Sequence, residues 1–91
     1  MYNKILNEWI RIIKKKIKYR SAYRGTKEMD LLLSSFVADI INILSTSELK
    51  KLNDFLNCND EDINNYYINK IPIKLFDNKK ILDLFINHKI K

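Results

Sequence analysis

The sequence predicts an all-α protein, a compact bundle of about five short helices forming a single domain over residues 1–91. Three observations support this fold class. A chain of 91 residues has room for one modest core. It contains one glycine and one proline, which leaves few positions for the tight turns of a many-stranded β fold. Its apolar residues recur at spacings of three and four, as they do along one face of a helix.

The first helix is expected to run to about Tyr23. Its apolar face consists of Ile5, Leu6, Trp9, Ile10, Ile13 and Ile17. The lysines of residues 14–18 fall largely off this face. Gly25 then ends the helix, and we expect it in the left-handed conformation that glycine adopts without steric cost. Thr26 is the expected N-cap of the next helix.

The second helix is expected to be the most buried element, because its apolar residues cover more than one face. They are Met29, Leu32, Leu33, Phe36, Val37, Ile40, Ile41 and Leu44. The segment Ser45-Thr46-Ser47-Glu48 matches a capping box, in which Ser45 caps a third helix and Glu48 reaches back to it. The apolar residues of that third helix are Leu49, Leu52, Phe55 and Leu56.

Two shorter helices complete the predicted bundle. The polar turn of residues 58–62 is expected to cap a fourth helix that runs to about Tyr67, with its acidic residues placed favourably at the helix N-terminus. Pro72 prevents that helix from continuing. A last helix is expected to run to about His88 and to carry Ile81, Leu82, Leu84 and Phe85, with Leu75 as a possible earlier member.

Composition narrows the classes of function. A single glycine excludes a glycine-rich phosphate loop, and a single histidine, His88, excludes a histidine pair for a metal and disfavours a catalytic triad. We interpret His88 as a solvated residue of the tail, and the lone Cys58 as a half-buried small residue rather than a nucleophile. The protein is therefore not expected to be an enzyme.

The expected setting is the cytoplasm of a bacterium. The lone cysteine indicates a reducing compartment, since it cannot form a disulfide framework. No apolar run approaches the roughly 18 residues of a membrane span, so membrane insertion is not expected. The N-terminus lacks the uninterrupted apolar stretch of a secretory signal.

The connection around Gly25 carries a resemblance to a known family. The pattern Arg24-Gly25-x-x-Glu28, followed by Asp30 and three leucines, resembles the signature of the FAD assembly factor SdhE family, the flavinators of succinate dehydrogenase. The likeness continues through residues 52–56, the acidic turn of residues 59–63 and the tyrosine pair of residues 66–67, and so covers roughly residues 17–75. The family has an aromatic residue in a gap between helices, and the resemblance implies this role for one of Tyr66 and Tyr67.

The resemblance implies a small helical assembly factor that binds the flavoprotein subunit of succinate dehydrogenase, with fumarate reductase as a further candidate partner, and promotes covalent attachment of FAD. Carried over by position, it places Arg24, Gly25 and Glu28 at the partner-binding surface, with Asp30 in support. No dinucleotide-binding fingerprint is present, so the chain is expected to bind no FAD tightly itself and to act on the FAD of its partner. It is expected to be a monomer when free.

Three further residues are expected on the face beside this connection, from their spacing alone. They are Tyr19, Arg20 and Tyr23. Tyrosine and arginine are frequent anchors of protein interfaces. The alternative for the two tyrosines is that they cover the core.

Two alternative functions arise from the net charge of +6. The first is nucleic-acid binding by the basic helix, through Lys14, Lys15, Lys16, Lys18 and Arg20. A helix-turn-helix reader is disfavoured, because the helix after Gly25 is too apolar to lie in a DNA groove. The second alternative is an interfacial membrane helix over residues 3–18.

Overall fold

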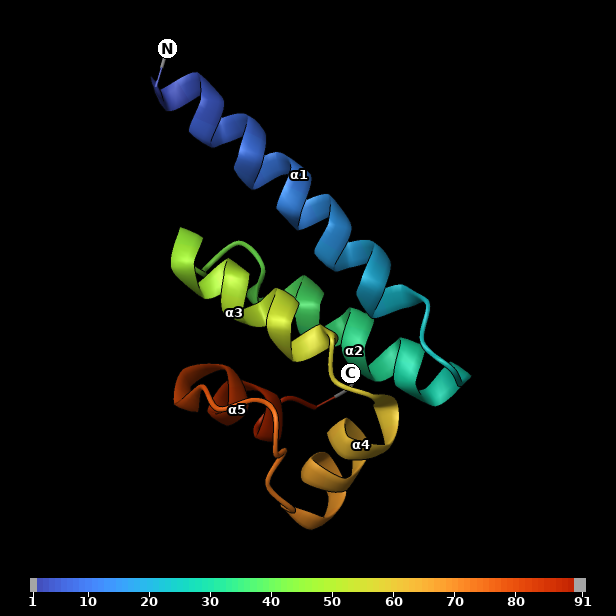
Figure 1. Ribbon diagram of the computed structural model, residues 1–91. Coiled ribbons are helices and arrows are strands. Elements are labelled where there is room, and N and C mark those ends of the chain that lie inside the picture. The colour runs from blue at the N-terminus through green and yellow to red at the C-terminus, as the bar shows by residue number, and fades with distance from the viewer. Residues whose placement is uncertain (1, 90–91) are drawn as a thin grey trace.

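Five helices form the described part of the chain, residues 2–89 of a computed structural model, with side chains described from residue 4 to residue 89 (Figure 1). They are α1 (Tyr2–Ala22), α2 (Lys27–Ile40), α3 (Thr46–Leu56), α4 (Asp60–Asn69) and α5 (Lys79–Ile86). Helix α1 lies along one side of the molecule and packs on α2 and α3, while α4 and α5 lie on the opposite side (Figure 1). The all-α prediction is confirmed.

The starts of the helices follow from local capping. Thr26 and Ser45 cap α2 and α3 as predicted, and Glu48 completes the capping box by accepting the backbone N–H of Ser45 at 2.7 Å. Asn59 caps α4 by accepting the N–H of Asp62. Asn78 caps α5 in the same way. Each cap satisfies a backbone donor that the first turn of a helix otherwise leaves unpaired.

The core is centred on three phenylalanines from different helices. Phe36 of α2, Phe55 of α3 and Phe85 of α5 are each fully buried. The ring of Phe85 lies 5.0 Å from each of the other two rings, in edge-to-face arrangements that aromatic pairs favour. Tyr67 packs on Phe85 with a centroid distance of 5.0 Å, so it fills the gap expected for one of the two tyrosines.

The backbone at Gly25 differs from the prediction. No described glycine has a positive φ angle, so Gly25 is not in the left-handed conformation. The described residue that adopts it is Lys70, with φ of 57°, at the end of α4. Helix α1 ends at Ala22 and the chain reverses through residues 23–26 without that conformation.

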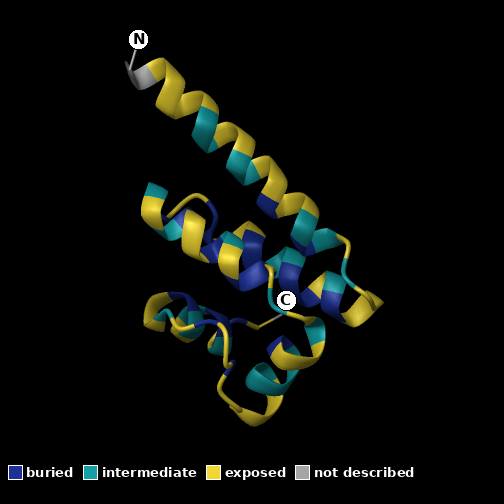
Figure 2. Cartoon of the chain, viewed as in Figure 1, coloured by how far each residue is buried: buried dark blue, intermediate teal, exposed yellow. Residues whose placement is uncertain are grey.

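Only part of the predicted apolar face of α1 is buried. Ile17 is fully buried, and Ile10 and Ile13 pack partly against the core. Ile5 remains 72% exposed, because the first turns of α1 extend beyond the rest of the bundle (Figures 1 and 2). This extension explains the elongated outline of 46 × 25 × 22 Å.

The end of the chain also departs from the prediction. Helix α5 ends at Ile86, and His88 is buried rather than solvated. The ring of His88 packs on Phe36, and its backbone carbonyl accepts the hydroxyl of Tyr67 at 2.6 Å. Leu75 precedes α5 and is 94% exposed, so it is not part of the last helix.

Candidate partner-binding surface

The connection between α1 and α2, residues 23–26, is held in place by Arg24. We call it the Gly25 corner. The guanidinium of Arg24 donates from Nε to Asp60 at 2.8 Å, from Nη1 to the carbonyl of Leu56 at 2.7 Å and from Nη2 to the carbonyl of Cys58 at 2.9 Å. Its side chain is only 10% exposed. The planar guanidinium of Arg24 therefore makes its hydrogen bonds within the chain, at the C-terminal end of α3. The resemblance had placed this side chain at the partner-binding surface.

Asp60 joins the start of α4 to the Gly25 corner. One of its carboxylate oxygens accepts Arg24 Nε, and the other accepts the backbone N–H of Gly25 at 2.9 Å. A Cβ atom added to Gly25 would lie 3.3 Å from that second oxygen, so the carboxylate can approach closely because the residue is glycine. Asp30 contributes from the other side, since its carboxylate accepts the backbone N–H of Arg24 at 2.5 Å.

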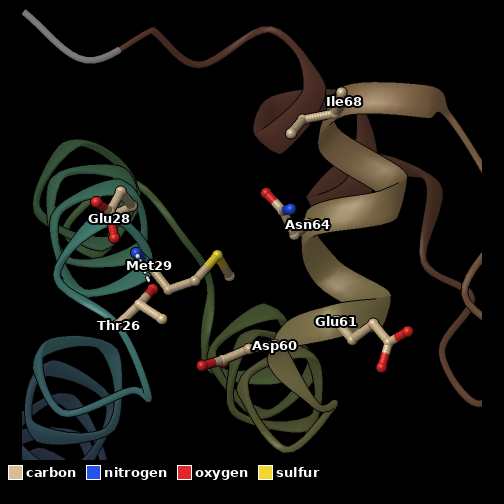
Figure 3. Close-up of a pocket in the computed structure, with 7 residues that line it drawn as sticks. All are labelled: Thr26, Glu28, Met29, Asp60, Glu61, Asn64 and Ile68. Carbon is tan, nitrogen blue, oxygen red and sulfur yellow. Dashed lines mark hydrogen bonds between the residues drawn. The ribbon is translucent and has the colours of Figure 1, made fainter.

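Glu28 borders a groove beside the Gly25 corner. The groove has a volume of about 510 Å³ and lies between the first turn of α2 and one face of α4 (Figure 3). Its lining residues are Thr26, Glu28, Met29, Asp60, Glu61, Asn64 and Ile68. The side chains of Met29 and Asn64 point into the space between the two helices, whereas Glu61 points away from it (Figure 3). The groove thus combines an apolar floor with carboxylates at its edge.

The three residues predicted beside the corner are divided between two roles. Tyr19 and Tyr23 are 65% and 69% exposed, and their rings contact each other with a centroid distance of 4.5 Å. They therefore do not cover the core. Arg20 instead donates to the side chain of Asn57, which ties α1 to the end of α3.

The seven predicted site residues thus form two groups. Arg20, Arg24 and Asp30 make hydrogen bonds within the chain, while Tyr19, Tyr23, Gly25 and Glu28 are exposed. Asp60 was missed as a site residue, because the sequence shows it only as one acid in the turn that caps α4. Its contact with Arg24 spans 36 positions, and no local pattern signals such a pairing.

Cys58 follows α3 and is partly buried next to this network. Burial raises the pKa of its thiol, and the nearby carboxylates of Asp62 and Asp54 raise it further, while Arg24 acts in the opposite direction. Because the thiolate is the reactive form, a raised pKa lowers reactivity near neutral pH. This agrees with the prediction that Cys58 is no nucleophile.

We expect Cys58 in the folded protein to react with iodoacetamide at pH 7.5 several-fold more slowly than a cysteine in an unstructured peptide. Unfolding in guanidinium chloride should restore the peptide rate, which provides the internal control. A rate in the folded protein that equals or exceeds the peptide rate would contradict this account of the thiol.

A second polar cluster lies near the C-terminus. The ring of His88 contacts Ser35 Oγ through Nε2 at 2.5 Å and Asp39 through Nδ1 at 3.3 Å. The order serine, histidine, aspartate is that of a catalytic triad. However, Ser35 lies within α2, where the neighbouring backbone N–H groups are used by the helix and cannot form an oxyanion hole. The cluster fastens the end of the chain to α2.

Other kinds of site receive no support within the described residues. Among residues 4–89, no three histidine, cysteine, aspartate or glutamate side chains are grouped so that they could hold a metal ion. In the part of the chain that the structure describes, no helix combines the length and apolarity needed to cross a bilayer.

Comparison with family models gives a match over residues 15–89 to the family described as flavinator of succinate dehydrogenase. The match includes the Gly25 corner and four complete helices, α2 to α5, and so extends beyond the region of residues 17–75 in which the resemblance was first apparent.

The chain belongs to this flavinator family.

Curated relatives agree with this assignment. The chain is 37% identical over 87 residues to succinate dehydrogenase assembly factor 2, mitochondrial, of Dictyostelium discoideum, covering 93% of this chain and 62% of the relative. It is 34% identical over 83 residues to the protein of the same name from Komagataella phaffii, covering 86% of this chain and 44% of the relative. The chain thus spans about half the length of these flavinator relatives. No solved structure gives a significant match.

Both relatives are named as mitochondrial proteins. The expected bacterial cytoplasmic setting of this flavinator family member is therefore still a prediction.

Proposed function

We propose that this chain is an assembly factor that binds the flavoprotein subunit of succinate dehydrogenase and promotes covalent attachment of FAD to it. Membership of the flavinator family over residues 15–89 is the observation that carries the proposal. The names of the two curated relatives support it. The nucleic-acid alternative has no comparable support.

The Gly25 corner is the proposed docking surface. Gly25 presents an exposed backbone without a side chain, so a partner can approach it closely. The contacts of Arg24 and Asp60 fix the shape of that backbone before binding. Glu28 adds an exposed carboxylate next to the groove, which would pair with a cation or an N–H donor of the flavoprotein. In this proposal Arg20, Arg24 and Asp30 shape the surface, while Gly25, Glu28, Tyr19 and Tyr23 contact the partner.

The proposed mechanism is conformational. The bundle would hold the flavoprotein subunit in a state in which the flavin ring meets its attachment residue, and the flavoprotein's own groups would form the bond. The rate of flavin attachment would rise because the reacting groups are held in the correct orientation. In this proposal the chain binds no FAD tightly, acts as a monomer, and can serve fumarate reductase as a second partner.

The proposal is tested by co-expressing the flavoprotein subunit with and without this chain. Covalent flavin is scored by in-gel fluorescence after denaturation, and free FAD is supplied equally to both cultures. We expect a several-fold higher fraction of flavinylated subunit when the chain is present. Equal flavinylation, with both proteins expressed and folded, would overturn the proposed function.

Replacing Glu28 with alanine should weaken binding to the flavoprotein subunit about tenfold, because an interface carboxylate that loses its partner interactions typically costs this much. The fold should be unaffected, since Glu28 is exposed in the first turn of α2. Affinity can be measured by calorimetry with the purified subunit.

Asp77→Ala is the matched control for Glu28→Ala, since Asp77 is an exposed acid in the connection before α5, outside the groove. It should bind normally. If both variants bind like the unaltered chain, the interface does not include Glu28.

A further inference from the structure

The outer face of α1 is a second exposed surface, which lies outside the groove and meets the Gly25 corner at Tyr23. Helix α1 packs on α2 and α3, and in the orientation of Figures 1 and 2 no other element lies beyond it on the side away from them. Three apolar or aromatic residues on it are spaced by seven: Ile5 is 72% exposed, Ile12 57% and Tyr19 65%. A spacing of seven shifts a residue by only about 20° around a helix, so these side chains form one stripe. Tyr23 extends the stripe beyond Tyr19.

Exposed cations flank this stripe. They are Lys4, Arg11, Lys15, Lys16 and Lys18. Lys16 follows Ile12 by four positions and Lys15 by three, which places them on opposite sides of the stripe. A shallow hollow lined by Arg11, Ile12, Lys15, Lys16 and Tyr19 lies between them. The described acid of α1, Glu8, is paired with Arg11 at 2.8 Å. The face is therefore apolar along its centre, with most of its cations along one edge and Lys16 at the other.

We propose that this outer face of α1 docks on an anionic phospholipid bilayer. Apolar side chains along the centre of the face would enter the boundary between headgroups and acyl chains, while the lysines would extend their stems sideways to reach headgroup phosphates. Tyr19 and Tyr23 combine an aromatic ring with a polar hydroxyl, the combination that is enriched at the surface of membranes. The helix would lie in the plane of the bilayer surface and would not cross it.

The charges and spacing disfavour the other occupants of such a face. A second copy of the chain would bring two cationic edges against each other. A partner helix would require an apolar residue three or four positions after each member of the stripe, but both positions after Ile12 hold lysines, Lys15 and Lys16. Nucleic acid would use the cations yet leave Ile5 and Ile12 exposed to water. A bilayer uses both kinds of side chain.

The test is co-sedimentation of the full chain with vesicles of phosphatidylcholine alone or with about one third phosphatidylglycerol. We expect binding to the anionic vesicles only, and a decrease as salt rises. Trp9, the single tryptophan, is partly exposed on α1 and should report binding by a blue shift of its fluorescence. No sedimentation with anionic vesicles at low salt would overturn the proposal.

Two variants test the contributions of the apolar and the cationic side chains separately. Ile12→Asp should abolish the fluorescence shift, and Lys15→Glu with Lys16→Glu should lower vesicle partitioning by an order of magnitude or more, since each cation near an anionic surface contributes roughly fivefold. The matched controls are Leu75→Asp, at a 94% exposed site before α5, and Lys74→Glu with Lys89→Glu, at exposed sites outside α1. The controls should retain binding, and circular dichroism should show all variants folded.

Two further outcomes would overturn the proposal in favour of another occupant. A dimer in equilibrium sedimentation that Ile12→Asp dissociates would assign the face to a second copy. Binding to duplex DNA tighter than to anionic vesicles, lost with the lysine variant and retained by Ile12→Asp, would assign it to nucleic acid. The variants that test this face, at Ile12, Lys15 and Lys16, leave the proposed docking surface at the Gly25 corner unaltered, so failure here does not bear on the flavoprotein proposal.

Discussion

Replacing Arg24 with alanine is expected to lower the free energy of unfolding by about 3 kcal/mol, because it removes a largely buried charge and leaves its partners unpaired. The carboxylate of Asp60 would lose its cation, and the carbonyls of Leu56 and Cys58 would lose their donors. Urea unfolding followed by circular dichroism measures the change. The slope of the transition should be unaltered, since the folded state buries the same surface.

Arg11→Ala is the appropriate control for this prediction. Arg11 lies on the same helix and also pairs with an acid, but both side chains are exposed, so its removal should not shift the urea midpoint measurably. Arg24→Lys should fall between the alanine variant and the unaltered chain, since lysine keeps the charge but cannot donate in three fixed directions. An Arg24→Ala variant as stable as the unaltered chain would show that the network contributes little.

Replacing Gly25 with arginine is expected to lower affinity for the flavoprotein subunit at least a hundredfold while leaving the bundle folded. The long side chain would occupy the space in which a partner approaches the backbone. The bundle should remain folded, with a small loss of stability. The φ angle of Gly25 is not positive, but the end of the Asp60 side chain, 3.3 Å from a new Cβ, must move by a few tenths of an ångström. Pull-down and calorimetry with the flavoprotein subunit measure the loss, and flavinylation in co-expression should fall in parallel.

Ala38→Arg provides the control for added bulk and charge, since Ala38 is exposed near the other end of α2. It should bind normally. Gly25→Ala should have an intermediate effect, because a single methyl group obstructs the approach less than an arginine. If Gly25→Arg binds the subunit as tightly as Ala38→Arg does, the docking surface lies elsewhere on the bundle.

The features that the sequence predicted correctly depend on neighbours within a few residues. The capping box of Ser45 and Glu48 and the cap at the start of α4 are local hydrogen-bond patterns, and the structure confirms them. The burial of Phe36 and its apolar neighbours on α2 followed from helical spacing. The start of α5 was less well placed, because the predicted apolar pattern reached back to Leu75 and overlooked Asn78 as a cap.

The features that were missed depend on residues far apart in the chain. The burial of His88 requires α2 and Tyr67 to meet the end of the chain, which no local pattern indicates. The same holds for Arg24, whose partners lie more than 30 positions away. The pattern Arg24-Gly25-x-x-Glu28 pointed to this corner as a partner-binding surface through family resemblance, but only the structure shows that its arginine is directed inward.

Arg24 and Gly25 both donate to the carboxylate of Asp60, and this affects how tightly the protein can bind a partner. Asp60 fixes both residues while the protein is free, so the turn has little backbone freedom left to lose when a complex forms. A loop that had to become ordered on contact would forfeit part of its interaction energy. In the proposed complex the shape of this turn is therefore set before contact, and adjustment on association is expected mainly in the flavoprotein subunit.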